Sequence, residues 1–132
     1  MIATSPPAAR GIADAAADPA VIDEDHLARM TLGDRALERE VLEIFVRQTV
    51  ILLERIAKAD PAFAAGAAHT LSGSASGIGA TRVAQAAERL EQAARAKASP
   101  AEFDGAVEAL KAATVEASAA ITARLGSVLR DH

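Results

Sequence analysis

The sequence contains no cysteine, no tryptophan and no tyrosine, and it has only three phenylalanines. The absence of cysteine excludes disulfides, thiolate nucleophiles and cysteine-ligated zinc or iron–sulfur sites, although it does not identify a compartment. Aromatic residues make up 2% of the chain, whereas 35 of its 132 residues are alanine. Because strands favour aromatic and β-branched residues and alanine is the strongest helix former, this composition predicts an all-α protein.

Long apolar runs and basic clusters are also missing. No apolar segment approaches the roughly 20 residues that a membrane-spanning helix requires. Pro6, Pro7 and Arg10 interrupt the N-terminal segment, which is unlike the continuous apolar core of a signal peptide. The net charge is −4 and the basic residues are scattered, so we expect neither a nucleic-acid nor a membrane partner. The sequence is interpreted as that of a cytoplasmic protein.

The chain length predicts one domain with a core of its own. Residues 1–20 mix alanine, proline, serine and aspartate without a helical period, and we expect them to form a flexible tail. Residues 21–132 are expected to form the domain.

Helix-boundary residues divide this domain into five helices. Asp23 and Asp34 are the expected N-caps of the first two helices, Asp60–Pro61 begins the third, and Ser99–Pro100 begins the fifth. Gly77 and Gly79 are expected to end the third helix. Four amphipathic helices with short connections predict an antiparallel four-helix bundle, on which the short helix over residues 23–30 forms an N-terminal lid.

The long second helix has apolar residues at steps of three and four, which is typical of an amphipathic helix. Its expected apolar stripe, interrupted only by Gln48, is Leu37, Val41, Ile44, Phe45, Ile51, Leu52 and Ile56.

The stretch AAHTLSGSASGIGA contains one histidine followed by small residues. At about 100° per residue, one face of a helix carries His69, Ser72, Gly73 and Ser76. A glycine inside a helix destabilises the fold by about 0.5–1 kcal/mol relative to alanine, so the presence of Gly73 in the middle of this helix requires an explanation. One interpretation is a docking surface around an exposed imidazole. The alternative is an ordinary surface histidine, with the small residues serving helix packing.

The longer segment AAHTLSGSASGIGATRVAQAAERLEQAA resembles the signature of histidine-containing phosphotransfer (HPt) domains. That signature has an alanine–histidine pair followed by Thr-Leu-Lys-Gly-Ser, a small-residue stretch, a glycine, and a Leu-Glu near the end of the next helix. The resemblance implies that His69 accepts a phosphoryl group from a sensor histidine kinase or a receiver-domain aspartate and passes it to a response regulator. Only residues 67–91 carry the resemblance residue by residue.

The resemblance also implies roles for neighbouring residues. Gly73 corresponds to the glycine that permits close approach of a partner, on the face that Ser72 and Ser76 share. Glu91 lies 22 residues after His69, where the family places a Glu or Gln that hydrogen-bonds the histidine Nδ1. Antiparallel helices joined near residue 80 would bring the two level. A carboxylate that accepts from Nδ1–H leaves Nε2 as the nucleophile.

Ser72 departs from the signature, because the family usually has a lysine three residues after the histidine. A serine hydroxyl donates one hydrogen bond but brings no positive charge to the phosphoryl oxygens. We therefore expect phosphotransfer to persist with a less stabilised phosphohistidine. The alternative function is a helical adaptor that docks receiver domains without carrying phosphate.

The implied mechanism needs no metal in this chain, because the receiver domain would supply Mg²⁺ and its acidic ligands. We expect a monomer that acts as a phosphotransfer intermediate rather than as a stand-alone enzyme. Asp23 and His26 are one helical turn apart and could share a metal ion. Two ligands alone more often belong to a solvated helix face, so no metal site is predicted.

Overall fold

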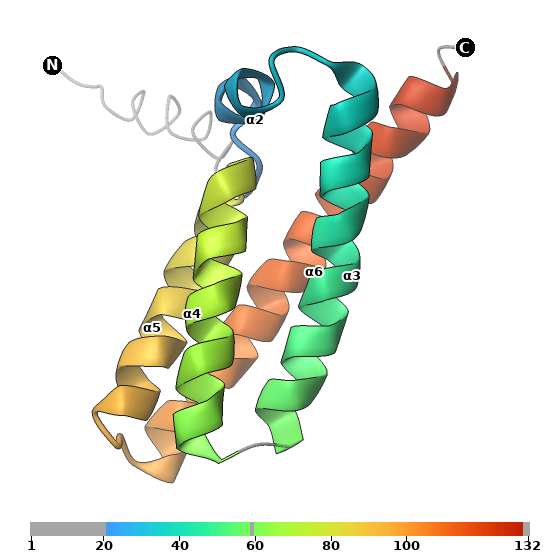
Figure 1. Cartoon of the computed structure of the whole chain (residues 1–132). Helices are drawn as coiled ribbons and strands as arrows, with labels where there is room; N and C mark the ends of the chain where they lie inside the picture. The colour runs from blue at the N-terminus through green and yellow to red at the C-terminus, as the bar shows by residue number, and fades with distance from the viewer. Residues whose placement is uncertain (1–20, 59, 131–132) are drawn as a thin grey trace, which may run out of the picture.

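The computed structural model describes residues 21–58 and 60–130, which form five α-helices and no strand (Figure 1). The helices are α2 (Glu24–Met30), α3 (Arg35–Lys58), α4 (Pro61–Ile78), α5 (Thr81–Arg95) and α6 (Pro100–Arg130). The prediction of an all-α protein is confirmed for this part of the chain. The flexible tail predicted for residues 1–20 lies outside the described residues. Within the described ranges, no helix has both the length and the apolar character needed to cross a membrane.

The helices begin at the caps that the sequence indicates. The side chains of Asp23, Asp34 and Asp60 each accept a hydrogen bond from the backbone N–H three residues later, at 3.0 Å. Before α6, Ser99 Oγ accepts from the N–H of Glu102 at 3.2 Å, and Glu102 Oε1 accepts from the N–H of Ser99 at 3.3 Å. Each cap satisfies a backbone group that the first turn of a helix leaves without a partner.

The turn from α4 to α5 is also where α2 is attached. Gly79 has a φ of +82°, and a Cβ on it would lie 2.9 Å from the backbone oxygen of Asp23. The Gly79 carbonyl accepts from the N–H of Asp23 at 2.8 Å, and His26 Nε2 donates to the Gly77 carbonyl at 3.1 Å. The interpretation of His26 as part of a solvated helix face was wrong, because its half-buried ring holds α2 against the end of α4.

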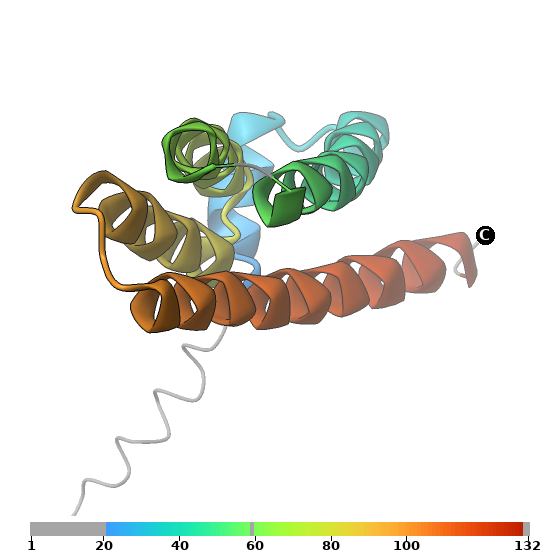
Figure 2. The same cartoon turned by 90° about the horizontal axis from the view of Figure 1, so that it is seen from below.

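The four long helices pack around one apolar core. Successive helices run in opposite directions in Figure 1, and Figure 2 shows α3 and α4 side by side above α5 and α6. Alanines on the buried side of α4 allow α5 to pack closely against it. The largest fully buried apolar side chains come from every helix: Leu27, Leu42, Ile56, Leu71, Val83, Leu90, Leu110 and Ile121.

The buried stripe predicted for α3 was partly wrong. Phe45, Leu52 and Ile56 are buried as expected, but Leu37, Ile44 and Ile51 are 39%, 48% and 48% exposed. The observed buried side is Glu38, Leu42, Phe45, Thr49, Leu52 and Ile56. The three exposed residues each precede a buried position by one residue, which is a step of about 100° around the helix.

A buried carboxylate joins α3 to α6 and α2. The side chain of Glu38 is 6% exposed, and its Oε1 accepts from Arg124 Nη2 at 2.9 Å. Arg124 Nε also donates to Glu24 Oε1 on α2, at 3.0 Å. Burial alone would lower the pKa of Arg124, but its hydrogen bonds with Glu38 and Glu24 and their charges raise that pKa above its ordinary value. The guanidinium therefore remains charged and ties three helices together.

Candidate functional site

His69 lies near the middle of α4, and its side chain is 73% exposed. Its Nδ1 is 3.1 Å from Glu91 Oε1 on α5. An ionised carboxylate can only accept a hydrogen bond, so Nδ1 carries the proton in this contact. In the neutral ring, Nε2 then keeps its lone pair and is available to an incoming group.

Glu91 is held through both of its carboxylate oxygens. Its side chain is 17% exposed, and Oε2 accepts from Arg95 Nε at 2.9 Å while Oε1 contacts His69. Burial raises the pKa of Glu91, but the hydrogen bonds from Arg95 and His69 and their charges lower it overall below its ordinary value of 4.5. The carboxylate is therefore ionised at neutral pH and fixed against the imidazole.

The small residues of α4 leave the surface beside His69 open. Gly73 and Ser76 are exposed, and Ser72 is half-buried. A Cβ added to Gly73 would meet no atom within 4 Å. Packing within this chain therefore does not require a glycine at position 73, which is evidence against the interpretation that this glycine serves helix packing.

The structure thus brings His69 and Glu91 into contact and places Ser72, Gly73 and Ser76 along α4 beside them. The only side-chain contact that the structure shows among these five residues is the one between His69 and Glu91. Their roles in phosphotransfer and docking stay predictions.

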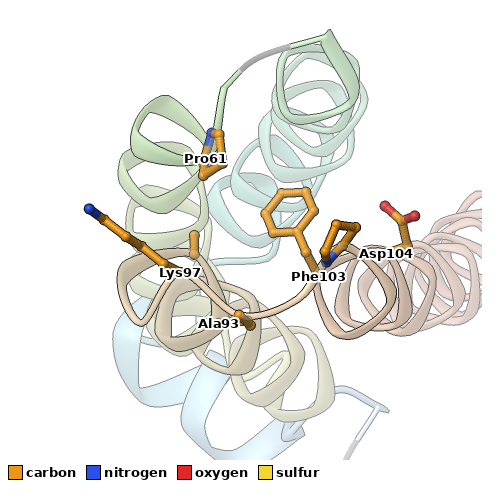
Figure 3. Close-up of a pocket in the computed structure, with 8 residues that line it drawn as sticks. Pro61, Ala93, Lys97, Phe103 and Asp104 are labelled. Atoms are coloured by element: carbon orange, nitrogen blue, oxygen red, sulfur yellow. The ribbon is translucent and has the colours of Figure 1, made fainter.

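An apolar pocket lies elsewhere, where α4 begins and α5 connects to α6. Its volume is about 300 Å³, and Figure 3 shows the ring of Phe103 facing Pro61 across it while Lys97 extends outward. Neither His69 nor Glu91 lines this pocket. The histidine site is accordingly a surface rather than a cavity. In the part of the chain that the structure describes, no three His, Cys, Asp or Glu side chains form a group suited to a metal ion.

Sequence reasoning missed the exposed apolar residues of α3, because Leu37, Ile44 and Ile51 were assigned to the core. The signal that could have found them is the number of apolar residues in α3. The apolar residues of α3 form two neighbouring stripes along the helix, and a helix needs only one such stripe to face a core.

A family model for the Hpt domain matches residues 40–121, which is more than half of the chain. The matched segment includes all of α4 and α5, with His69 and Glu91. The chain therefore belongs to the Hpt domain family, whose members carry out histidine phosphotransfer in two-component signalling and interact with receiver domains and kinases. The comparisons with curated proteins and with solved structures give no match.

Proposed function

We propose that this protein is a phosphotransfer intermediate of a phosphorelay. His69 accepts a phosphoryl group from a sensor kinase or a receiver-domain aspartate and passes it to a response regulator. The observation that carries the proposal is the exposed His69 ring with its Nδ1 bonded to Glu91, on a helix surface that Gly73 leaves open.

The transfer step uses the two ring nitrogens differently. The Nε2 lone pair of His69 attacks the phosphorus of an aspartyl phosphate, and the bond between phosphorus and the aspartate oxygen breaks. The bonding electrons leave on that aspartate, while Nδ1 keeps its proton, so the imidazole ring becomes positively charged. The Glu91 carboxylate contacts Nδ1 at 3.1 Å and stabilises the charge that develops. The reverse reaction returns the phosphoryl group to a second receiver.

The proposed partners determine the remaining assignments. Mg²⁺ and its acidic ligands are expected in the receiver domain, so the chain would need no metal of its own. We place the protein in the cytoplasm because receiver domains act there, and we expect a monomer since one exposed histidine suffices. We assign residues 21–132 to one antiparallel four-helix bundle with α2 as a lid. The alternating helix directions in Figure 1 support that arrangement.

The proposed docking face includes Ser72, Gly73 and Ser76, and it extends onto α3, which packs beside α4. The exposed aliphatic residues of α3 would supply the apolar part of the interface: Leu37, Ile44 and Ile51. Protein interfaces commonly combine an apolar centre with a polar rim. A receiver domain centred on His69 would cover both helices.

Phosphate labelling tests the function. Incubation with a radiolabelled phosphorylated receiver domain or an active sensor kinase is expected to leave acid-labile phosphate on the protein. The His69→Gln variant is expected to remain folded, because the ring is exposed, and to acquire no label. Receiver binding without labelling of the wild type would contradict the proposal and favour the adaptor, which the serine at position 72 also suits. Label that persists in His69→Gln would contradict the choice of histidine.

A further inference from the structure

The surface around His69 lacks the cation that the family signature provides. Ser72 occupies the position of the lysine, and α4 contains no Asp, Glu, Lys or Arg. A phosphoryl group carries close to two negative charges at neutral pH. Glu91 adds a further negative charge in direct contact with the ring. If phosphate is to persist on His69, positive charge has to come from another helix.

Arg95 on α5 is bonded to the same carboxylate as His69. Its Nε donates to Glu91 Oε2 at 2.9 Å, while the other oxygen, Oε1, contacts the imidazole. The Arg95 side chain is 60% exposed. Among the described residues, its two terminal nitrogens have no hydrogen-bond partner. The guanidinium therefore holds Glu91 in place and still has donors directed to solvent.

Arg95 also lines a groove between the start of α4 and the end of α5, which neither His69 nor Glu91 lines. The groove has a volume of about 550 Å³, and its α4 side includes Ala62 and Ala65. These alanines precede His69 by seven and four residues, so they lie on the same face of the helix. Both side chains are small and Ala65 is buried, so neither position of α4 places a long side chain beside Arg95.

Resting on the proposed function, we propose that Arg95 is a positioning residue that replaces the missing lysine. It holds the Glu91 carboxylate against Nδ1 of His69 and supplies the positive charge that sustains the phosphorylated ring. The phosphorylated ring, the phosphoryl group, Glu91 and Arg95 together carry one net negative charge. Without Arg95, the same group carries two, and Glu91 loses the contact that fixes it.

The lifetime of the phosphorylated protein tests this assignment. The wild type and Arg95→Gln are labelled with a phosphorylated receiver domain, separated from it, and followed for loss of acid-labile phosphate. We expect Arg95→Gln to shorten the half-life about two- to fivefold, which corresponds to a solvent-exposed ion pair. High salt is expected to reduce the difference, because exposed charges are screened. Adding Ser72→Lys to Arg95→Gln is expected to restore the half-life.

The matched control is Arg89→Gln, which removes an exposed arginine of α5 other than the one that is hydrogen-bonded to Glu91. Its half-life is expected to equal that of the wild type, and thermal unfolding is expected to show that every variant is folded at the labelling temperature. Equal half-lives of labelled wild type and labelled Arg95→Gln would overturn the role of Arg95 and leave the proposed function intact. A loss that Ser72→Lys does not restore would overturn the electrostatic role. Failure to label the wild type would instead overturn the proposed function.

Discussion

In the proposed transfer, Glu91 is the residue that orients His69 as a nucleophile. Its ionised carboxylate contacts Nδ1 and would face the charge that the ring gains on phosphorylation. A hydrogen bond that involves a charged group contributes about 1.5–3 kcal/mol, which corresponds to roughly ten- to hundredfold in rate. We expect Glu91→Ala to slow phosphotransfer by about that factor. Glu91→Gln keeps an acceptor for Nδ1–H and is expected to lose less.

Rapid-mixing measurements of phosphotransfer from a phosphorylated receiver domain check this difference between the two variants. The control is Glu88→Ala, an exposed glutamate of the same helix, which is expected to transfer at the wild-type rate. If Glu91→Ala transferred as fast as the control, the orientation of the ring by Glu91 would not matter.

The lowered pKa of Glu91 also predicts a pH dependence of stability. A carboxyl group with a lower pKa in the folded than in the unfolded state stabilises the fold above its unfolded pKa. This contribution is present above about pH 4.5 and is lost as the pH falls through the lower, folded value. Thermal unfolding should show wild type more stable than Glu91→Gln at neutral pH and equal to it in strong acid. A difference that persists unchanged in acid would contradict the ionised contact.

A substitution of Gly73 is expected to change the stability of the fold and the rate of phosphotransfer in opposite directions. Since a Cβ at this position meets no atom within 4 Å, Gly73→Ala is expected to stabilise the fold by about 0.5–1 kcal/mol. The added methyl group stands on the proposed docking face, so phosphotransfer is expected to slow. Gly105→Ala on α6 is the matched control, because its Cβ also meets nothing, and it should stabilise without slowing transfer. Denaturant unfolding measures the stability of the two variants, and phosphotransfer assays measure their transfer rates. A Gly73→Ala protein that transfers at the wild-type rate would refute the role of Gly73 in docking.

At the scale of single helices, boundaries were predictable and one buried face was not. Caps such as Asp23, Asp60 and the Ser99–Glu102 pair depend on residues three positions apart, so the sequence contains the whole interaction. The His69–Glu91 contact was predictable for a similar reason, since two helices joined by a tight turn have a known register. The buried side of α3 instead includes Glu38, whose partner Arg124 lies 86 residues away and could not be paired with it from spacing.

The contact between Glu38 and Arg124 is expected to determine how firmly α2 and α6 are attached to α3. Arg124→Ala leaves a carboxylate buried without its cation, which costs roughly 3 kcal/mol when the partner of a buried ion pair is removed. Replacing both residues with leucine should recover part of that loss. Lys111→Ala removes an exposed pair with Glu108 and is expected to change stability by less than about 1 kcal/mol. Denaturant unfolding measures all three, and equal effects of Arg124→Ala and Lys111→Ala would contradict the role of the buried pair.

For the molecule as a whole, the proposed docking face combines two kinds of chemistry from neighbouring helices. α4 contributes the histidine and a surface of small residues, and α3, packed beside it, contributes exposed aliphatic side chains. Neither helix alone would provide both a reactive group and apolar area for a partner. The proposed docking face accounts for the apolar residues of α3 in two registers, since one register faces the core and the other would contact a receiver domain.

Polar substitutions on α3 test its contribution to the proposed docking face. Exchanging Ile44 and Ile51 for serine is expected to leave the fold intact, because both side chains are about half exposed. If each contributes about 1 kcal/mol to the interface, receiver binding should weaken roughly tenfold or more. The loss should appear as slower transfer at low receiver concentration and disappear at saturation, because the reacting groups on α4 and α5 are unchanged. Val115→Ser on α6, where the side chain is 70% exposed, is expected to have no effect on binding. If the variant with both isoleucines replaced bound the receiver domain as tightly as Val115→Ser, the docking face would be confined to α4.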